Sequence, residues 1–126
     1  MKQFFLILLL AASIQGFSQS ESAFFTALKN NDSATMESYL DDKIDFSFFE
    51  DQQMLNKSVA ISKLKNFISS QKVLSVEVIH KGSSKDRSSK YKVAKLTTST
   101  DTYRVFVFSA GDFDSKSIKE IRIDKF

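Results

Sequence analysis

Residues 72–125, KVLSVEVIHKGSSKDRSSKYKVAKLTTSTDTYRVFVFSAGDFDSKSIKEIRIDK, contain the four segments that decide the fold. Apolar and polar residues alternate with a period of two across 73–81, 90–99, 102–109 and 117–125, a pattern typical of β-strands with two unlike faces. Short polar connections separate the four segments. We therefore expect a curved antiparallel meander of four strands.

The pairing of the first two strands predicts which side chains share a face, because a one-residue slip would invert every side chain. If Lys81 lies opposite Tyr91, Glu77 lies opposite Lys95 as a cross-strand ion pair. One face is then apolar, and it comprises Leu74, Val76, Val78, His80, Ala94, Leu96, Tyr103, Val105, Val107, Ile121 and Ile123. The other face is mixed, and it comprises Val73, Ile79, Val93, Arg104, Phe106, Phe108, Ile118, Glu120 and Arg122.

Short helices and one strand are predicted ahead of the meander. Apolar residues recur at helical spacing in three segments, which predicts three helices. The first helix spans 20–30. The second is capped by Asp32 or Ser33 and runs to about Leu40, and the third is capped by Asn56 or Ser58 and runs to about Ser70. Residues 44–48 alternate as a strand does, and the polar residues 50–53 are expected to form a loop. The order predicts an α+β domain in which the helices cover the apolar face of the sheet.

The first 18 residues have the pattern of an export signal. Lys2 precedes the apolar run FFLILLLAA at 4–12, and small residues occupy Gly16 and Ser18, just before Gln19. The apolar run is too short to span a bilayer, which takes about 20 residues. We therefore expect cleavage after Ser18, a single domain over 19–126, no membrane insertion after cleavage, and a periplasmic or secreted protein. The alternative is a buried N-terminal helix or strand.

Composition narrows the possible functions. The chain has no cysteine, so it can form no disulfide and carry no lipoprotein anchor. A formal net charge of +3 is too weak a bias to predict nucleic-acid binding. The single histidine has no carboxylates at metal-ligand spacing beside it, and no phosphate-binding loop is present. The sequence therefore predicts neither a metal nor a cofactor.

Several ordered segments carry a resemblance to a known family. They are the helix break ALKNND at 27–32, Tyr39-Leu40, Ala60 with LKNFI at 64–68, VIHKGS at 78–83, TYRVFVF at 102–108 and IKEIRI at 118–123. Together they resemble the exported proteins of Gram-negative bacteria that contain domain of unknown function 4783. The order of elements is that of the nuclear-transport-factor-2-like (cystatin-like) fold. The resemblance implies three helices on a curved sheet, a cone-like pocket between them and frequent dimerisation through the sheet, but no known activity.

A pocket between helices and sheet is the expected site for a small apolar or amphipathic ligand. The residues expected to bind it are His80, Tyr103, Tyr39, Phe67 and Val76, with Phe24 and Leu28 beside them. The alternative for His80 is a structural ring that bonds a helix end, and for Tyr103 a core position with a satisfied hydroxyl.

The mixed face is unusually aromatic for a surface in water, so a homodimer through it is expected. The residues expected at this interface are Arg104, Phe106, Phe108 and Ile118. Alternatively, Phe113 or Phe126 folds over the patch. A structural partnership within the cell envelope is a further alternative to ligand binding.

An enzyme is the main alternative to a binding module. Enzymes of the resembled fold place an Asp, His or Tyr in the cone as a general base for isomerisation or dehydration. The candidates here are Asp45, Tyr39, His80 and Tyr103, and a base must reach its proton before its pKa matters. The sequence offers no further catalytic motif, and we expect a non-catalytic protein.

The first hairpin of the meander is basic. It contains six basic residues and one acidic residue, Asp86. The basic residues are Lys81, Lys85, Arg87, Lys90, Lys92 and Lys95. These charges could attract an anionic polymer or partner. They could equally be solvated lysines that deter pairing at a strand edge.

Overall fold

The computed structural model describes residues 23–86 and 88–126. The signal peptide predicted for residues 1–18 and the first four residues of the predicted domain, 19–22, lie outside the described residues. The elements in chain order are α2 (Ala23–Asn30), α3 (Ser33–Tyr39), β1 (Leu40–Phe48), β2 (Asp51–Asn56), α4 (Lys57–Ser69), β3 (Val73–Ser83), β4 (Ser89–Thr98), β5 (Thr102–Ala110) and β6 (Ile118–Lys125). None of the described helices is long and apolar enough to cross a membrane.

The starts of α3 and α4 lie close to the predicted positions, with Asp32 and Asn56 as their N-cap residues, although only Asp32 makes a side-chain cap hydrogen bond. Asp32 caps α3 by accepting a hydrogen bond from the backbone N–H of Thr35 at 3.3 Å and another from the Thr35 hydroxyl at 2.6 Å. Asn31, in the left-handed region at φ 55°, separates α2 from α3. Of the stripe predicted for α4 from its spacing, Ala60, Leu64 and Ile68 are buried and Phe67 is partly buried, and Ile61 is buried beside them.

The strands form one six-stranded sheet in the order β2-β1-β6-β5-β4-β3. The predicted meander β3-β4-β5-β6 is confirmed, and each neighbouring pair within it is antiparallel. The sheet as a whole is mixed, because β1 joins β6 in parallel. That parallel pairing places the N-terminal half of the domain beside the last strand of the chain.

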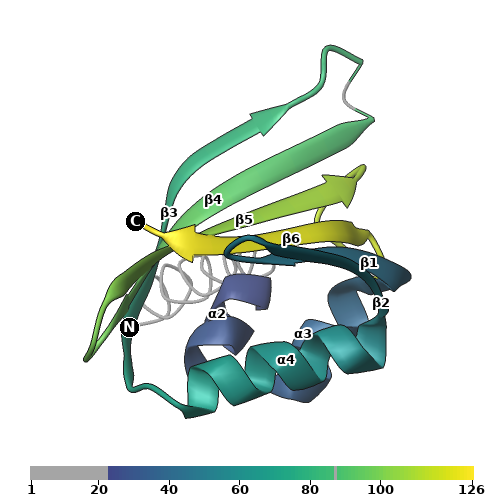
Figure 1. Ribbon diagram of the computed structural model, residues 1–126. Helices are drawn as coiled ribbons and strands as arrows, with labels where there is room; N and C mark the ends of the chain where they lie inside the picture. Colours follow the sequence, from purple (N-terminus) through teal and green to yellow (C-terminus); the bar gives the residue numbers. More distant parts are fainter. Residues whose placement is uncertain (1–22, 87) are drawn as a thin grey trace, which may run out of the picture.

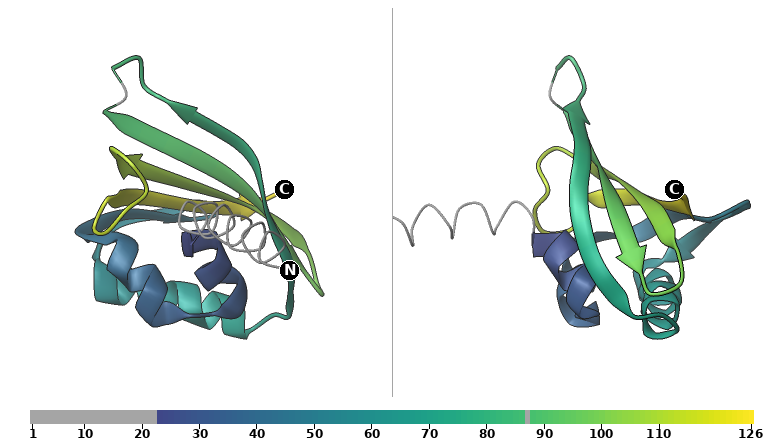
Figure 2. Two further views of the ribbon diagram at one scale, coloured as in Figure 1. Left: turned by 180° about the vertical axis from the view of Figure 1, so that it is seen from behind. Right: turned by 90° about the vertical axis from the view of Figure 1, so that its left-hand side faces the viewer.

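The three helices lie together against one face of the sheet, which we call the inner face (Figure 1). The opposite face is the outer face. The ends of β3 and β4 nearest their connecting hairpin project beyond the helices, as both further views show (Figure 2). The core therefore lies under β1, β6, β5 and the lower part of β4. Its sheet residues include Ala94, Leu96, Val105, Val107, Ile121 and Ile123.

The loop predicted at 50–53 was wrong, because Asp51–Asn56 is the edge strand β2. It pairs with β1 in an antiparallel hairpin whose loop is only Phe49 and Glu50. Backbone bonds to β1 hold β2 in place while nearly all of its side chains stay exposed. An edge strand can be stabilised by backbone hydrogen bonds to its one neighbouring strand. Its sequence therefore does not need the alternation of apolar residues from which strands are predicted.

Two irregularities in β3 change the predicted faces. Val78 lies opposite Ala94 while His80 lies opposite Val93, so Ile79 is the extra residue of a β-bulge. The predicted opposition of Glu77 and Lys95 is confirmed. The predicted opposition of Lys81 and Tyr91 was wrong, because after the bulge Gly82 lies opposite Tyr91.

The main consequence of this bulge is a change in the face on which His80 lies. It was predicted to end the apolar face, and it lies instead on the outer face with Val93 and Tyr91. The earlier irregularity, at Leu74, also shifts the pairing by one residue and changes which side chains face inward. It leaves Leu74 exposed and turns Val73 inward, opposite the buried Thr98.

Ile118 was also assigned to the wrong face. Phe108 lies opposite Glu120 and Ser109 lies opposite Ile118, so Lys119 is the extra residue between them. Ile118 therefore points inward, and its side chain is 0% exposed. A residue buried this deeply in the core is not part of an outer interface.

Candidate ligand-binding site

Four aromatic rings meet where the end of β1 and the start of β5 face α4. Phe48 contacts Phe49 with ring centroids 4.7 Å apart and contacts Phe67 at 5.0 Å. Tyr103 closes the circle, at 5.0 Å from Phe67 and 6.1 Å from Phe49. All four contacts are edge-to-face, the geometry that the ring quadrupole favours. We call these four residues the aromatic quartet.

A groove of about 380 Å³ opens beside the quartet. The residues that line it are Phe48, Asp51, Lys63, Asn66, Phe67 and Ser70. Its base is therefore aromatic, while exposed groups of opposite charge, Asp51 and Lys63, stand at its rim. An apolar floor with a few polar groups around it is the usual composition of a small-molecule site.

Phe49 holds its place in the quartet at a conformational cost. It occupies the first position of the two-residue β1–β2 loop with φ 58°, a region that bulky residues rarely adopt and in which glycine is preferred at this position. Its backbone N–H donates to the carbonyl of Ile123 at 2.8 Å, which anchors the turn to β6. The ring remains 39% exposed. Backbone strain of this kind persists where the surrounding structure enforces it, and it is frequent at functional sites.

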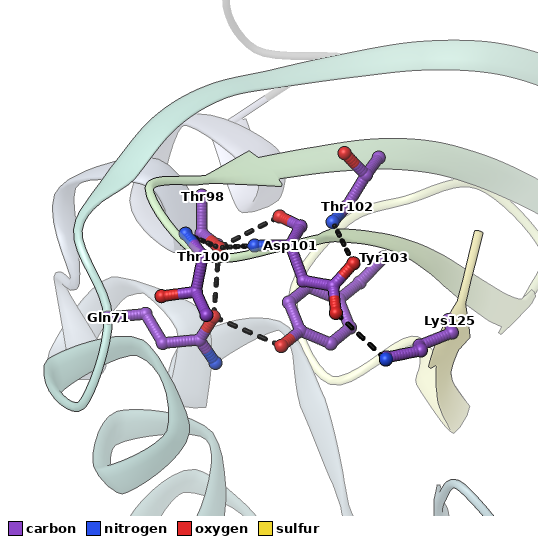
Figure 3. Close-up of polar contacts among 7 residues, drawn as sticks. All are labelled: Gln71, Thr98, Thr100, Asp101, Thr102, Tyr103 and Lys125. Carbon is purple, nitrogen blue, oxygen red and sulfur yellow. Dashed lines mark hydrogen bonds and ion pairs between the residues drawn. The ribbon is translucent and has the colours of Figure 1, made fainter.

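Tyr103 is positioned through its hydroxyl, which donates to Oε1 of Gln71 at 3.1 Å. Gln71 lies just after α4, and its Oε1 is also 2.8 Å from the hydroxyl oxygen of Thr98 (Figure 3). The Thr98 hydroxyl accepts hydrogen bonds from the backbone N–H groups of Thr100 and Asp101, at 3.2 Å and 3.0 Å. A polar network thus connects the end of α4, the β4–β5 turn and one ring of the quartet.

The same turn is fastened to the C-terminal strand. The Asp101 carboxylate accepts a hydrogen bond from the Thr102 N–H at 3.0 Å, and Nζ of Lys125 lies 2.9 Å from it (Figure 3). The hydrogen bond from Lys125 is the main cause that lowers the pKa of Asp101, and its counterpart raises the pKa of Lys125. Both groups are exposed, so the pair orients the turn more than it stabilises the fold.

The structure brings together only part of the predicted ligand set. Phe67 and Tyr103 are in direct contact within the quartet. Tyr39 packs its ring on Phe24, 6.5 Å away, and Val76 packs against the core. His80 lies on the opposite face of the sheet. The buried Phe24 and Leu28 belong to the core, so the expected lining of one pocket by all these residues was wrong.

Phe48 and Phe49 are site residues that the sequence analysis missed. The alternation at 44–48 predicts a strand that ends at Phe48, but it does not link Phe48 to Phe67 or Tyr103. A signal was present, because two phenylalanines in succession sit where a strand gives way to polar residues. Their convergence on Tyr103 depends on the parallel pairing of β1 with β6, which places β1 two strands from β5.

The four candidates for a general base do not form a cluster. Asp45 accepts hydrogen bonds from Nε2 of Gln52 at 3.0 and 3.1 Å on the exposed β1–β2 hairpin. Among residues 23–86 and 88–126, no hydrogen bond or ring contact joins Asp45, Tyr39, His80 and Tyr103 to one another. The described part of the chain also contains no group of three or more metal-ligating side chains.

The outer face carries the predicted interface residues except Ile118. Phe106 stacks on Tyr91 with centroids 5.8 Å apart, and the Arg122 guanidinium lies 5.9 Å from the Phe106 ring. Arg104 lies over Phe126, and Lys95 approaches the same ring. Arg122 also pairs with Glu120. Phe126 therefore lies at one end of this face against Arg104 and Lys95, while Phe106 and Phe108 remain half-exposed. The ring contacts of the described residues do not place Phe126 over Phe106 or Phe108, as the predicted alternative required.

Comparisons with solved structures agree with this architecture. A DUF4783 family protein from Bacteroides ovatus is 29% identical, with a TM-score of 0.71 over 80% of this chain and 90% of that chain. One from Bacteroides uniformis is 30% identical, with a TM-score of 0.70 over 80% and 92%. A search of curated protein sequences finds no match.

More distant structures share the fold alone. An LEH-like epoxide hydrolase from M. tuberculosis is 16% identical, with a TM-score of 0.56 over 83% of this chain and 78% of that chain. A putative isomerase from Rhodopseudomonas palustris is 15% identical, with a TM-score of 0.53 over 88% and 87%. The profile of the family described as Domain of unknown function (DUF4783) matches residues 22–124. The chain therefore belongs to the DUF4783 family, and it has the nuclear-transport-factor-2-like fold.

Proposed function

We propose that this protein is a non-catalytic binding module that holds a small amphipathic ligand in the groove beside the aromatic quartet. The observation that carries the proposal is the closed circle of Phe48, Phe49, Phe67 and Tyr103 next to an open groove of about 380 Å³. Apolar surface that a ligand buries on these rings contributes roughly 25 cal/mol per Å² before the costs of association.

The rim of the groove suggests the chemistry of the ligand. Its apolar part packs on Phe48 and Phe67, and its polar part lies between Lys63 and Asp51. The two charges have opposite sign, so a ligand with an anionic group turns toward Lys63 and away from Asp51. Exposed charges of this kind orient a ligand more than they add affinity.

The separation of the general-base candidates supports binding over catalysis. A base for isomerisation or dehydration must stand within hydrogen-bond reach of a substrate in the pocket. Of the four candidates only Tyr103 adjoins the groove, and its hydroxyl already donates to Gln71. The enzyme-like neighbours share too little sequence for their activities to be carried over.

A fluorescence titration with 1-anilinonaphthalene-8-sulfonate tests the groove, because this probe joins a flat apolar body to a single sulfonate. We expect saturable binding to the folded wild type and its loss in Phe67→Ala. Lys63→Ala should weaken binding and Asp51→Asn should tighten it, each by up to about fivefold. Met54→Ala is the matched control, since Met54 is 70% exposed on β2 and outside the groove.

Circular dichroism and thermal unfolding on every variant separate lost binding from lost structure. If Phe67→Ala unfolds, the opposite effects of the two rim charges still decide the question. Equal binding by Lys63→Ala, Asp51→Asn and wild type would place the probe elsewhere, and the proposal would be abandoned.

The outer face favours a second role, self-association. It carries Lys95, Arg104 and Arg122 together with Glu77, Glu120 and Asp124, arranged around the half-exposed Phe106 and Phe108. A surface with both signs of charge around apolar rings can be complementary to a second copy of itself, as a two-fold dimer requires. We therefore propose a homodimer through Arg104, Phe106 and Phe108, with Ile118 removed from the expected set.

Residues 2–18 support the cellular address that we propose for this module, the periplasm or the medium. Intact-mass measurement of the protein purified from its native host tests it. A chain beginning at Gln19 supports export with cleavage, whereas a full-length chain from the cytoplasmic fraction contradicts it.

A further inference from the structure

The groove beside the aromatic quartet has one charged side chain on each of its two walls. Asp51, the first residue of β2, stands on the strand side, and Lys63 of α4 stands on the helix side. Both side chains are exposed. The rim of the groove therefore carries one charge of each sign, and this arrangement restricts the ligands that fit it.

The pairing of β2 with β1 sets the position of Asp51. Asp51 lies directly opposite Phe48, and residues opposite each other on neighbouring strands share a face of the sheet. The Phe48 ring contacts Phe67 of α4, with the ring centroids 5.0 Å apart. The carboxylate of Asp51 therefore borders the two rings that form the base of the groove.

The helical period of α4 sets the position of Lys63. Lys63 precedes Phe67 by four residues, so the two lie on the same face of the helix, about 6 Å apart along its axis. Asn66, three residues after Lys63, lines the same groove. The ammonium group of Lys63 therefore reaches the groove from the helix side, within one turn of the Phe67 ring.

Neither charge has a partner within the described part of the protein. Among residues 23–86 and 88–126, no ion pair or side-chain hydrogen bond includes Asp51, Lys63 or the side-chain amide of Asn66. The two charges therefore do not pair with each other across the groove. By contrast, Lys57 at the start of α4 pairs with Asp42 of β1 at 3.6 Å. The groove thus presents one acidic group and one basic group to a ligand.

A ligand with a single charge meets one favourable and one unfavourable group in this groove. A carboxylate beside Lys63 is also close to Asp51, and an ammonium group beside Asp51 is also close to Lys63. Like charges brought together in this way count against the ligand. A molecule with both groups instead meets a complementary partner on each wall, and its apolar part can still pack on Phe48 and Phe67.

We propose that the ligand of this groove is a zwitterion with one apolar side group, the chemistry of a free apolar or aromatic α-amino acid. Its ammonium group binds Asp51, and its carboxylate binds Lys63, with the Asn66 amide as a further donor. Its side group packs on the aromatic base. A volume of about 380 Å³ is at the lower end for small-molecule sites, which suits a molecule of this size. The ligand class rests on the proposed function, since it specifies what that same groove holds.

Three probes that share a phenyl ring test the proposal, in NMR titrations of the ¹⁵N-labelled protein. L-Phenylalanine carries both charges, 3-phenylpropanoate lacks the ammonium group, and phenethylamine lacks the carboxylate. We expect saturable amide shifts at residues 48–51 and 63–70, with L-phenylalanine binding roughly two- to fivefold more tightly than either analogue. Asp51→Asn should weaken the binding of L-phenylalanine and tighten that of 3-phenylpropanoate. Lys63→Gln should weaken the binding of L-phenylalanine and tighten that of phenethylamine.

The matched controls are Glu50→Gln and Lys65→Gln, which remove the same charges at nearby exposed positions outside the groove. Neither should change the order of the three probes. Equal binding of L-phenylalanine and 3-phenylpropanoate to the wild type, or an effect of Asp51→Asn in the same direction on both, would overturn the ligand class. If 1-anilinonaphthalene-8-sulfonate still binds in the groove as expected, the ligand class alone fails. If no probe shifts the residues of the groove, the proposed function fails with it.

Discussion

Nε2 of His80 lies 2.7 Å from the hydroxyl oxygen of Tyr91 on the outer face of the sheet. The two rings are 5.4 Å apart, and Tyr91 continues the row by stacking on Phe106. Gly82, directly opposite Tyr91, makes this arrangement possible. A Cβ atom at Gly82 would lie 2.5 Å from the Tyr91 ring, so the ring covers the glycine backbone.

Gly82→Ala should displace the Tyr91 ring and break its contacts with His80 and Phe106. We expect a loss of about 1–3 kcal/mol in the free energy of unfolding, as for other overpacked positions. The control is the same change in a Tyr91→Ala background. There the methyl group has room, and alanine should stabilise the strand by about 0.5–1 kcal/mol relative to glycine. Urea unfolding of the four proteins measures both effects, and equal signs in the two backgrounds would contradict the packing described here.

Asp86 should remain ionised to unusually low pH. Hydrogen bonds from Ser84 and Ser88 lower its pKa from 3.8 to about 2. A depressed folded-state pKa means that its contribution to the order of the hairpin is complete above the unfolded value of 3.8 and is lost as the pH falls through about 2. A carbon-detected NMR titration of the Asp86 carboxyl measures this directly. In Ser84→Ala/Ser88→Ala the pKa should return toward 3.8, and an unchanged low pKa would exclude the serines as its cause.

Thr98→Val should destabilise the domain although it conserves shape. The substitution removes the hydroxyl that accepts from Thr100 and Asp101 and adjoins Gln71, leaving these groups without that partner. We expect a loss of about 1–3 kcal/mol in thermal or urea unfolding. Thr97→Val is the matched control on the same strand, since Thr97 faces outward and valine is as good a strand former. Equal losses in the two variants would show that the network contributes nothing specific.

Phe106 and Ile118 should behave differently, although they were first assigned to one interface. Phe106→Asp places a charge in the proposed dimer surface and should reduce the mass measured by light scattering to that of a monomer. Ile118→Ala removes a fully buried side chain and should cost about 2–5 kcal/mol of stability. If Phe106→Asp leaves the oligomer mass unchanged, the proposed dimer through this face is excluded. A loss for Ile118→Ala below 1 kcal/mol would contradict its place in the core.

Most elements of the fold follow from local patterns in the chain. Asp32 caps α3 because a short carboxylate reaches the N–H groups of the next turn. The apolar stripe of α4 follows from a period of 3.6 residues, and the four strands of the meander follow from a period of 2. These periods are properties of the local sequence and do not depend on which element packs against it. The quartet could be predicted only in part, because Phe67 and Tyr103 were chosen for the pocket without Phe48 and Phe49.

The remaining features depend on contacts between distant segments. Within the meander, the irregularities at Leu74, Ile79 and Lys119 each shift the pairing of a strand by one residue and reverse the faces beyond it. No local pattern marks these positions, because the alternation of side chains looks the same with or without an extra residue. Tertiary packing selects the bulge that buries Ile118 and accommodates the curvature of β3. As a result, His80 lies on the outer face and Lys81 on the inner face. The tertiary structure therefore determines which side chains each face of the sheet presents.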